Sequence, residues 1–498
     1  MRTMPQQHKP RPEGLILFAL GLGAMIVSMM QTLVVPILGT IGHRLHASST
    51  DVSWVLTANL LAAAVLTPLL GRLGDQLGKK KVLVASMIVL VAGSLLAATT
   101  SSLGLLITAR ALQGVGTAIF PLAIGIARDE IRPAKLPGAM ALISATLSVG
   151  GGVGLVATGL LIQGDNPDYH RVFWLATALA ALALVAVVAL VPAGTRAKVA
   201  SRVDWLGAAT LGATLVALLL PLSQGNSWGW TSARTLGLFA ASVVLAGLWV
   251  LVERRVAAPL VDLRMFARRQ VAMTNIAALL FGFAMFGMFI GASTMVQIPH
   301  ALAGYGFGAT VLRAAVEYLL PSSLVSVLAA PLGGLLVRRI GAKAVLALGT
   351  VTGVVGFSSF ALWHEKSWQV IAAVMISGVA ISLGYAAMPA LIVAAVPVEQ
   401  TGIANGLNSI ARTVGSSVAS AVVTTLLTSR LVVHKPFPPL PAESGFTLTF
   451  WLCAGACALA ALVTLIGVRG NTHSEPPHVV ALNDVEALPE LAGAGRKI

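Results

Sequence analysis

Residues 68–83, PLLGRLGDQLGKKKVL, recur in related form at residues 331–346 as PLGGLLVRRIGAKAVL. When the two stretches are aligned without gaps, eight of their sixteen positions are identical. Each copy leaves one apolar run, passes through glycines and basic residues, and enters another apolar run. Such a long-range repeat predicts a chain built from two related halves.

The apolar runs beside the repeat continue over almost the whole chain. Hydrophobic residues make up 57% of the 498 residues and charged residues only 10%, a balance that excludes a soluble globular protein. An apolar run of about 20 residues can cross a bilayer as a helix. We therefore predict an all-α integral membrane protein with fourteen spans, at residues 14–41, 52–71, 82–99, 103–127, 137–162, 172–192, 205–222, 235–252, 271–297, 311–337, 344–363, 368–393, 403–428 and 446–468.

The basic residues indicate how the chain is oriented. If the N-terminus is cytoplasmic, 24 of the 33 Lys and Arg residues lie in cytoplasmic segments, six lie in outer loops and three lie in spans. This asymmetry follows the positive-inside rule, and it explains the net charge of +15 without a nucleic-acid partner. We predict a multi-pass protein of the cell (cytoplasmic) membrane with both termini in the cytoplasm.

The two repeat copies are eight predicted spans apart, which places both on the same face of the membrane. Two six-helix halves with two inserted helices between them give this spacing, and parallel halves around a midplane site are a transporter arrangement. The predicted units are a cytoplasmic N-terminus, an N-terminal half, a two-helix insert with a basic linker, a C-terminal half and a disordered cytoplasmic tail, at residues 1–13, 14–192, 193–270, 271–468 and 469–498.

Four further motifs carry a family resemblance. They are Trp54-Val-Leu-Thr57, Leu106-Ile-Thr-Ala-Arg-Ala-Leu-Gln-Gly-Val-Gly116, Asp204-Trp-Leu-Gly207 and Pro259-Leu-Val-Asp-Leu263. With the first repeat copy, they resemble the 14-span drug:H⁺ antiporter branch of the major facilitator superfamily, in an order that covers most of the chain. The resemblance implies a proton-driven exporter that works by alternating access.

In the resembling family, the loop between spans 2 and 3 holds the cytoplasmic gate closed. The resemblance implies this role for Asp75, an acid among basic residues, together with Gly71, Arg72, Gly78 and Lys79. The residues alone leave a plainer alternative. Glycines permit a tight turn, and lysines anchor the cytoplasmic boundary whatever the acid does.

Charged residues inside spans are candidates for proton coupling. Arg110 lies roughly 12 Å into span 4, where a charge is costly unless it faces a cavity or a partner. The resemblance implies that it works with buried carboxylates. Glu317 is the only acid clearly inside a predicted span, and Arg313 lies one helical turn before it. We assign proton coupling to Glu317, Arg313 and Arg110, with a salt bridge at the outer end of span 10 as the alternative for the first two.

Polar residues in or at the edge of spans are candidates for a substrate cavity, with helix packing as the alternative for each. They are Gln31, Asn59, Gln113, Asn275, Gln297, Asn408 and Arg412. With arginines in the spans and no acid in span 1, we see no support for a preference for cationic drugs. Neutral or anionic amphipaths fit at least as well.

Two departures from the family pattern concern coupling more than the fold. Met30 occupies the place where many 14-span relatives carry an aspartate in span 1. The span-5 antiporter motif keeps glycines for helix packing at Gly150, Gly154 and Gly159, but Leu155 replaces its helix-kinking proline.

The sequence therefore predicts a secondary active transporter that exports hydrophobic or amphipathic compounds, such as drugs or antibiotics, in exchange for protons. The alternatives are a facilitator or specific metabolite exporter without tight proton coupling, and a non-transporting membrane sensor. The chain shows no nucleophile elbow, metal-ligand cluster or phosphate-binding loop, so we expect neither an enzyme nor an ATP-driven pump. The expected partners are a small-molecule substrate, protons and the lipid bilayer. We expect no cofactor, metal, nucleotide or nucleic acid.

Overall fold

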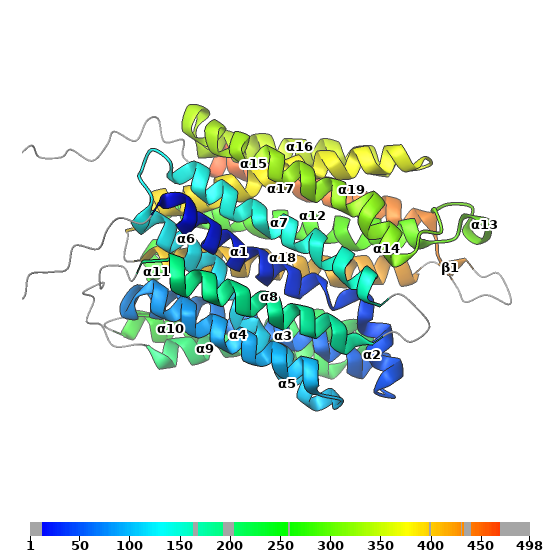
Figure 1. The fold of residues 1–498 in the computed structure, drawn as a ribbon, viewed down its shortest axis with the longest axis horizontal. Coiled ribbons are helices and arrows are strands. Elements are labelled where there is room, and N and C mark those ends of the chain that lie inside the picture. Colours follow the sequence, from blue (N-terminus) through cyan, green and yellow to red (C-terminus); the bar gives the residue numbers. More distant parts are fainter. Residues whose placement is uncertain are drawn as a thin grey trace, which may run out of the picture.

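The protein is a bundle of long helices that run close to its longest axis (Figure 1). This computed structural model describes residues 12–162, 168–192, 204–256, 259–397, 400–429, 431–432 and 440–468. Within these ranges, fourteen helical segments are long and apolar enough to cross a membrane, which confirms the predicted number of spans. The predicted disordered tail, most of the N-terminal segment and residues 193–203 of the linker lie outside the described residues.

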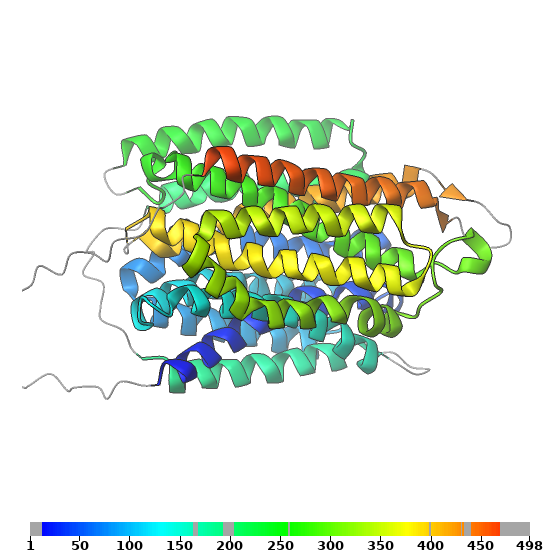
Figure 2. The same cartoon turned by 90° about the horizontal axis from the view of Figure 1, so that it is seen from above.

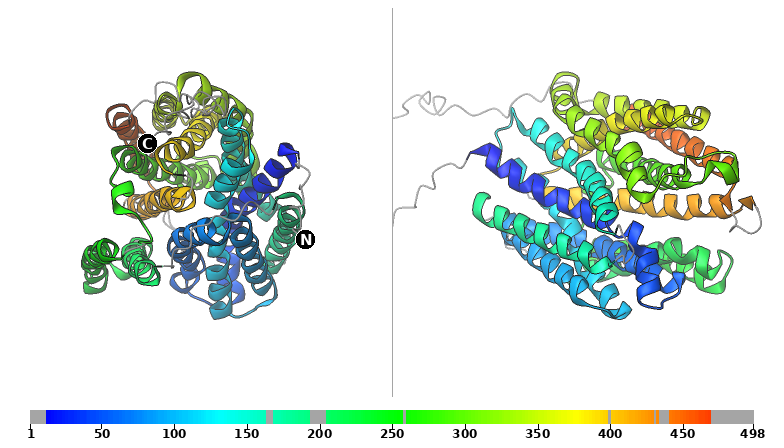
Figure 3. Two further views of the ribbon diagram at one scale, coloured as in Figure 1. Left: turned by 90° about the vertical axis from the view of Figure 1, so that its left-hand side faces the viewer. Right: turned by 45° about the vertical axis from the view of Figure 1, so that its right-hand side comes forward.

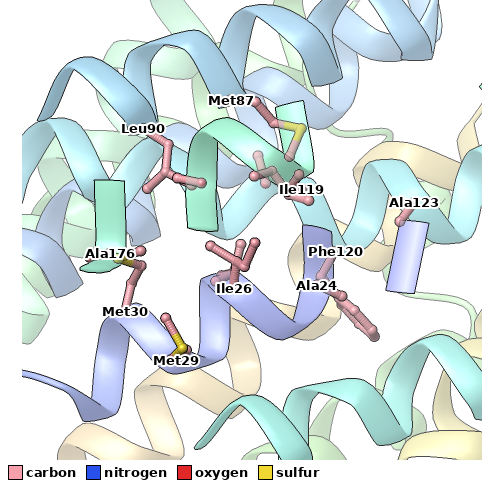
Figure 4. Packing of buried hydrophobic residues seen from close by; sticks show 14 of the residues in the cluster. Ala24, Ile26, Met29, Met30, Met87, Leu90, Ile119, Phe120, Ala123 and Ala176 are labelled. Carbon is pink, nitrogen blue, oxygen red and sulfur yellow. The ribbon is translucent and has the colours of Figure 1, made fainter. Parts of the chain in front are cut away.

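The first half contains six spans around a core of buried aliphatic and methionine side chains, part of which Figure 4 shows. Two of the spans are interrupted, one by a short 3-10 turn after α1 and the other by a 3-10 turn within the span-4 motif. The elements are α1 (Glu13–Thr32), η1 (Val35–Ile37), α2 (Leu38–Arg44), α3 (Ser49–Leu77), α4 (Lys79–Thr99), α5 (Leu103–Gly114), η2 (Val115–Ala118), α6 (Ile119–Glu130), α7 (Leu136–Leu161) and α8 (Tyr169–Leu190).

The two inserted helices lie at the edge of the bundle, as the end-on view in Figure 3 shows. They are α9 (Trp205–Trp228) and α10 (Ala233–Arg255), and the short α11 (Leu263–Phe266) follows in the linker. Helix α9 packs against α3 of the first half and α18 of the second, while α10 packs mainly against α9. The insert therefore contacts both halves through a single helix.

The second half also contains six spans. Its elements are α12 (Arg269–Gln297), α13 (His300–Ala303), α14 (Val311–Arg313), the π-helical η3 (Ala314–Leu319), α15 (Leu320–Ile340), α16 (Ala342–Leu362), α17 (Ser367–Ala395), α18 (Thr401–Ser429), β1 (Leu431–Val432), β2 (Leu440–Pro441) and α19 (Glu443–Gly467). The two short strands pair antiparallel. The start of α1 and the end of α19 lie at the same end of the bundle (Figure 2).

The repeat forms the same local structure twice, because each copy is a helix, a glycine break and a second helix. Gly78 separates α3 from α4 with φ +102°, and Gly341 separates α15 from α16 with φ +84°. Glycine adopts these backbone conformations readily, whereas a side chain is strained in them. The helix of span 2 extends past residue 71, where the predicted span ends. Helix α3 continues to Leu77, so Asp75 lies in its last turn and not in a loop.

One end of the bundle carries the charged residues of both repeat copies, and we call it the basic end. It is defined by Arg72, Lys79–Lys81, Arg338, Arg339 and Lys343. The opposite end carries α2, α13 and β1 (Figure 1). Every depth in the bundle can therefore be given relative to these two ends.

Candidate functional site

A cavity of about 320 Å³ lies between the two halves. Residues from both halves line it, and the inserted helix α9 adds Ser223. Its polar lining consists of Ser28, Gln31, Thr32, Asn59, Arg110, Ser223, Ser322, Ser323, Tyr385, Arg412, Thr413, Ser416, Ser417 and Ser420. Within the described part of the chain, its lining contains two arginines and no Asp or Glu.

The structure places three of the seven predicted cavity residues on this wall, namely Gln31, Asn59 and Arg412. The other four predicted residues are not part of the lining. Gln113, Asn275 and Asn408 are buried behind it, and Gln297 lies in the last turn of α12, where its amide donates to the Ser293 carbonyl at 2.7 Å. The sequence does not show which polar residues of a helix line the cavity and which lie one helical turn away, behind the lining.

Arg110 is buried on the cavity wall with 1% of its surface exposed. Its Nε donates to the Val55 carbonyl at 3.1 Å, and its Nη1 donates to the Met30 carbonyl at 3.2 Å and to the Gln113 side chain at 2.5 Å. Gln113 in turn donates to Ser94 at 2.9 Å, which fixes its orientation. Neutral acceptors therefore satisfy the buried guanidinium, and no ion pair with a carboxylate is seen within the described ranges.

The residue in place of the family's span-1 acid contributes only its backbone to this network. The Met30 side chain belongs to the hydrophobic core of the first half, near Ala176 and Ile26 in Figure 4. Its side chain is not part of the cavity lining. An apolar residue, and not a titratable one, therefore lies beside Arg110 at this position.

Arg412 lies on α18 at the boundary between the halves. Its guanidinium donates to Asn408 at 3.0 Å and to Ser409 at 3.1 Å. Asn408 is itself held by Asn275, to which its amide donates at 3.0 Å. The guanidinium carbon also lies 5.5 Å from the ring centre of Phe120 in the first half and 5.2 Å from that of Tyr385 in the second. Such distances allow cation–π attraction.

At the basic end, Asp75 joins the two halves by accepting hydrogen bonds from the start of α18. The backbone N–H of Gly402 lies 3.1 Å from one carboxylate oxygen and that of Ile403 lies 3.3 Å from it. The carboxylate is buried, with the residue 3% exposed. A helix N-terminus presents unpaired N–H groups and a partial positive charge, so it is a favourable partner for a carboxylate.

Glycine contacts close the basic end on two sides. A Cβ at Gly71 would lie 2.8 Å from the Gly402 carbonyl oxygen, and a Cβ at Gly334 would meet the backbone of Gly138. Gly71 and Gly334 are equivalent positions of the two repeat copies, so each half packs its repeat glycine against the start of a helix in the other half. Arg128 adds hydrogen bonds to Thr401 and to the Val396 carbonyl.

The other predicted gate residues surround this contact. Gly78 forms the break after α3, and Lys79 pairs with Asp129 of α6 at 2.7 Å. Arg72 lies on a second, smaller hollow of about 210 Å³ together with Ile403 and linker residues such as Asp262.

The cavity is reached from the end opposite to the basic end. Gln31 and Val35 line it on that side and are exposed. The contacts at Asp75, Gly71 and Gly334 close the other side. The structure therefore shows the conformation in which the central cavity is open away from the basic end.

Glu317 lies outside the cavity, on the π-helical segment η3 near the opposite end. Its carboxylate pairs with the Arg313 Nε at 2.6 Å, and the two side chains are 33% and 52% exposed. This geometry fits the salt-bridge alternative. Other acids lie near the ends of the long helices and outside the predicted spans, among them Asp75 of α3, Glu130 of α6 and Glu253 of α10.

The three glycines of the span-5 motif each face a neighbouring helix. A Cβ at Gly150 would overlap the Met25 carbonyl of α1, and one at Gly154 would lie 2.9 Å from the Met29 carbonyl. A Cβ at Gly159 would lie 3.1 Å from the Cα of Leu312 in the second half. Helix α7 runs without a break past Leu155, which lines the cavity.

Sequence reasoning missed several polar contacts. Asp204 and Glu253, at the two ends of the insert, are buried with 8% and 4% exposure. Their carboxylates accept from the backbone N–H groups of Leu260 at 3.4 Å and Val261 at 3.3 Å. Their occurrence at both borders of the insert was the available signal. Arg128 gave none, because an arginine just after an apolar run has the same appearance whether it anchors the membrane boundary or crosses to the other half.

No group of three or more His, Cys, Asp or Glu side chains that could hold a metal is found in the part of the chain that the structure describes. Two six-helix halves that enclose a cavity open at one end and closed at the other define a membrane transporter.

Comparisons with known proteins support this class. The sequence model of the Major Facilitator Superfamily matches residues 20–323 and 314–489, and the chain belongs to that family. It is 27% identical to the tetracenomycin C resistance and export protein of Streptomyces glaucescens, over 96% of this chain and 88% of the relative. It is 26% identical to multidrug resistance protein 3 of Bacillus subtilis, over 86% and 83%.

A solved structure shows the same fold. The crystal structure of the human organic anion transporter MFSD10 (TETRAN) matches with a TM-score of 0.62 and 14% sequence identity, over 91% of this chain and 99% of that one. The likeness concerns the fold alone. The predicted fold class, with two six-helix halves and two inserted helices, is thus confirmed.

Proposed function

We propose that the protein exports hydrophobic or amphipathic small molecules across the cell membrane by alternating access, without any catalysed reaction. The central cavity, which both halves line and which is closed at one end only, carries this proposal. Its volume lies at the lower end of the roughly 300–1,000 Å³ range of small-molecule sites. The substrate class is supported by relatives named as a tetracenomycin C resistance and export protein, a multidrug resistance protein and a probable actinorhodin transporter.

Transport by the purified protein in proteoliposomes tests the proposal. Vesicles of one orientation would be loaded with neutral, anionic or cationic amphipaths, with and without an imposed pH gradient. We expect the protein to move a probe from the side of the basic end to the opposite side of the membrane. Protein-free liposomes should show no such movement. A full panel of probes without protein-dependent movement would contradict the proposal.

The basic end faces the cytoplasm in this proposal, because Lys and Arg gather there. We expect reporter domains fused after residues 76, 198 and 264 to be cytoplasmic and those fused after residues 165, 225 and 435 to lie outside. Alkaline phosphatase and green fluorescent protein fusions would measure the two locations. If residues 198 and 225 exchanged sides, the orientation assigned to the insert would be contradicted.

Export without tight proton coupling is the second candidate. One observation favours it, because Arg110 and Arg412 occur on the described cavity wall without an acid. In a proton-coupled exporter, Glu317, Arg313 and Arg110 would carry the coupling role that the sequence predicts for them. The alternative for Glu317 and Arg313 is a salt bridge without a role in coupling, and their partly exposed pair favours this alternative. Imposing and removing the pH gradient in the vesicles separates the two mechanisms.

Glu317→Gln tests the coupling role directly. Since its pair with Arg313 is partly exposed, such an i,i+4 contact contributes only about 0.3–0.5 kcal/mol, and we expect export to stay within about twofold of the wild type. The measurement is gradient-driven export against exchange without a gradient. Glu443→Gln is the matched control, because Glu443 pairs with His364 at 2.9 Å and is also exposed. Loss of gradient-driven export with preserved exchange in the Glu317 variant alone would assign the coupling proton to Glu317.

A further inference from the structure

We propose that the cavity selects anionic amphipaths, with a carboxylate, sulfonate or phenolate held at Arg412 and an aromatic or aliphatic body against the apolar wall. The inference rests on the proposed export function and names its substrate class. Its starting point is the charge of the lining, which in the described residues contains two guanidinium groups and no carboxylate. A guanidinium keeps its charge in proteins, so the cavity wall carries an excess of positive charge.

Arg412 has the geometry of an anion site. Asn408 and Ser409 fix one side of its guanidinium, and Asn275 fixes Asn408 in turn. These bonds and the contact with Tyr385 leave N–H donors of the five-donor group for a ligand in the cavity. A planar guanidinium can donate two parallel hydrogen bonds to a carboxylate or sulfonate, which makes it more selective for such groups than a point charge.

Arg110 differs from Arg412 in this respect. Three of its hydrogen bonds go to the Val55 and Met30 carbonyls and to Gln113, and it is almost fully buried. Arg110 therefore adds positive charge to the cavity wall, while its burial leaves it less accessible to a ligand than the partly exposed Arg412. The direct anion contact falls to Arg412.

The depth of Arg412 suits an amphipath. Along α18 it lies eleven residues after Thr401, on the order of 16 Å from the basic end. Apolar side chains such as Phe286, Phe289 and Met285 line the cavity as well. Burying an apolar body against them contributes about 25 cal/mol per Å², while the anion decides the orientation of the molecule.

A matched pair of fluorescent probes tests the inference. 1-Anilinonaphthalene-8-sulfonate and N-phenyl-1-naphthylamine share the same aromatic body and differ by the sulfonate. Binding to the purified full-length protein and transport in proteoliposomes would be measured for both. We expect Arg412→Gln to raise the Kd of the sulfonate at least about tenfold and to change the Kd of the neutral probe less than about twofold.

Two controls accompany this experiment. Arg234→Gln removes a positive charge near the opposite end, where Arg234 lies 3.6 Å from the ring centre of Trp228, outside the cavity lining. It should leave both Kd values unchanged, and a tenfold effect there would overturn the assignment to Arg412. Competition on the wild type needs no variant. Naphthalene-1-sulfonate should displace N-phenyl-1-naphthylamine at about tenfold lower concentration than 1-naphthylmethanol, and equal potency would overturn the inference.

The two proposals fail in different ways. If both probes were transported, bound with equal Kd and were unaffected by Arg412→Gln, the substrate class would be overturned and export would stand. Absence of protein-dependent transport for every probe would overturn export. Charge-selective binding at Arg412 would then still establish the anion site.

Discussion

Asp75→Asn is expected to open the basic end and to lower export at least about tenfold while membrane insertion is unchanged. The carboxylate accepts from the N–H groups of Gly402 and Ile403 in the other half. An asparagine at this position removes the negative charge. Only its amide oxygen can accept from the two N–H groups, because its N–H₂ group is itself a donor. A hydrogen bond to a charged group contributes about 1.5–3 kcal/mol, and 2 kcal/mol changes a two-state ratio about 30-fold.

Cysteine accessibility would measure the opening. The two natural cysteines, Cys453 and Cys457, are buried and would be replaced by alanine. A single cysteine at Ser416 then reports from the cavity wall. A polar maleimide applied at the basic end should label this cysteine faster in the Asp75 variant than in the unaltered background.

Asp129→Asn is the matched control, since Asp129 lies at the same end but pairs with Lys79 of its own half, with 37% of the Asp129 side chain exposed. The loss of this pair does not break a contact between the two halves, so we expect little change in labelling or export. Equal labelling and normal export in both variants would show that Asp75 does not hold the gate closed. The basic residues around it would then only anchor the cytoplasmic boundary.

Gly150→Ala is expected to destabilise the protein and to abolish export. The added Cβ would overlap the Met25 carbonyl oxygen, which belongs to the backbone of α1 and cannot rotate away. Overpacking of this kind costs about 1–3 kcal/mol, more than the roughly 1 kcal/mol that alanine gains over glycine inside a helix. Separation of α1 from α7 would also displace Thr32, which donates to the Gly151 carbonyl at 3.0 Å on the cavity wall. Thermal unfolding of the purified protein gives the measurement.

Gly138→Ala on the same helix is the control. No atom lies within 4 Å of a Cβ built at Gly138, so the helix preference of alanine should dominate and the unfolding temperature should stay equal or rise. A Gly150 variant as stable as the Gly138 variant would show that α1 and α7 do not depend on this close approach.

Hydropathy and charge predicted the spans well because both are properties of single segments. They did not show how far the helix of span 2 extends. Polar residues such as Asp75 end an apolar run, but α3 continues beyond it until Gly78, where the backbone conformation and not polarity stops the helix. The length of an apolar run measures the width of the hydrocarbon layer and not the length of the helix.

The candidate site was only partly predictable because its contacts are non-local. Arg110 and Arg412 are conspicuous in apolar spans, and both line the cavity. Which neighbours they meet depends on how helices rotate against each other. Asn408 and Gln113 therefore turned out to support the arginines from behind. Ser223 could not be identified, since nothing in its own segment shows that α9 reaches the cavity.

Gly71 and Gly334, the equivalent glycines of the two repeat copies, form unequal junctions between the halves. On one side, Asp75 strengthens the contact of α3 with α18; on the other, Arg338 takes the equivalent position in the repeat and is exposed. Helices α7 and α15 nonetheless face each other along the bundle, from Gly138 and Gly334 at the basic end to Gly152 and Ser323 nearer the middle. A seam of small residues can pivot without breaking charged contacts. The α7–α15 seam would thus act as the hinge of the transport cycle, and the α3–α18 junction as its latch.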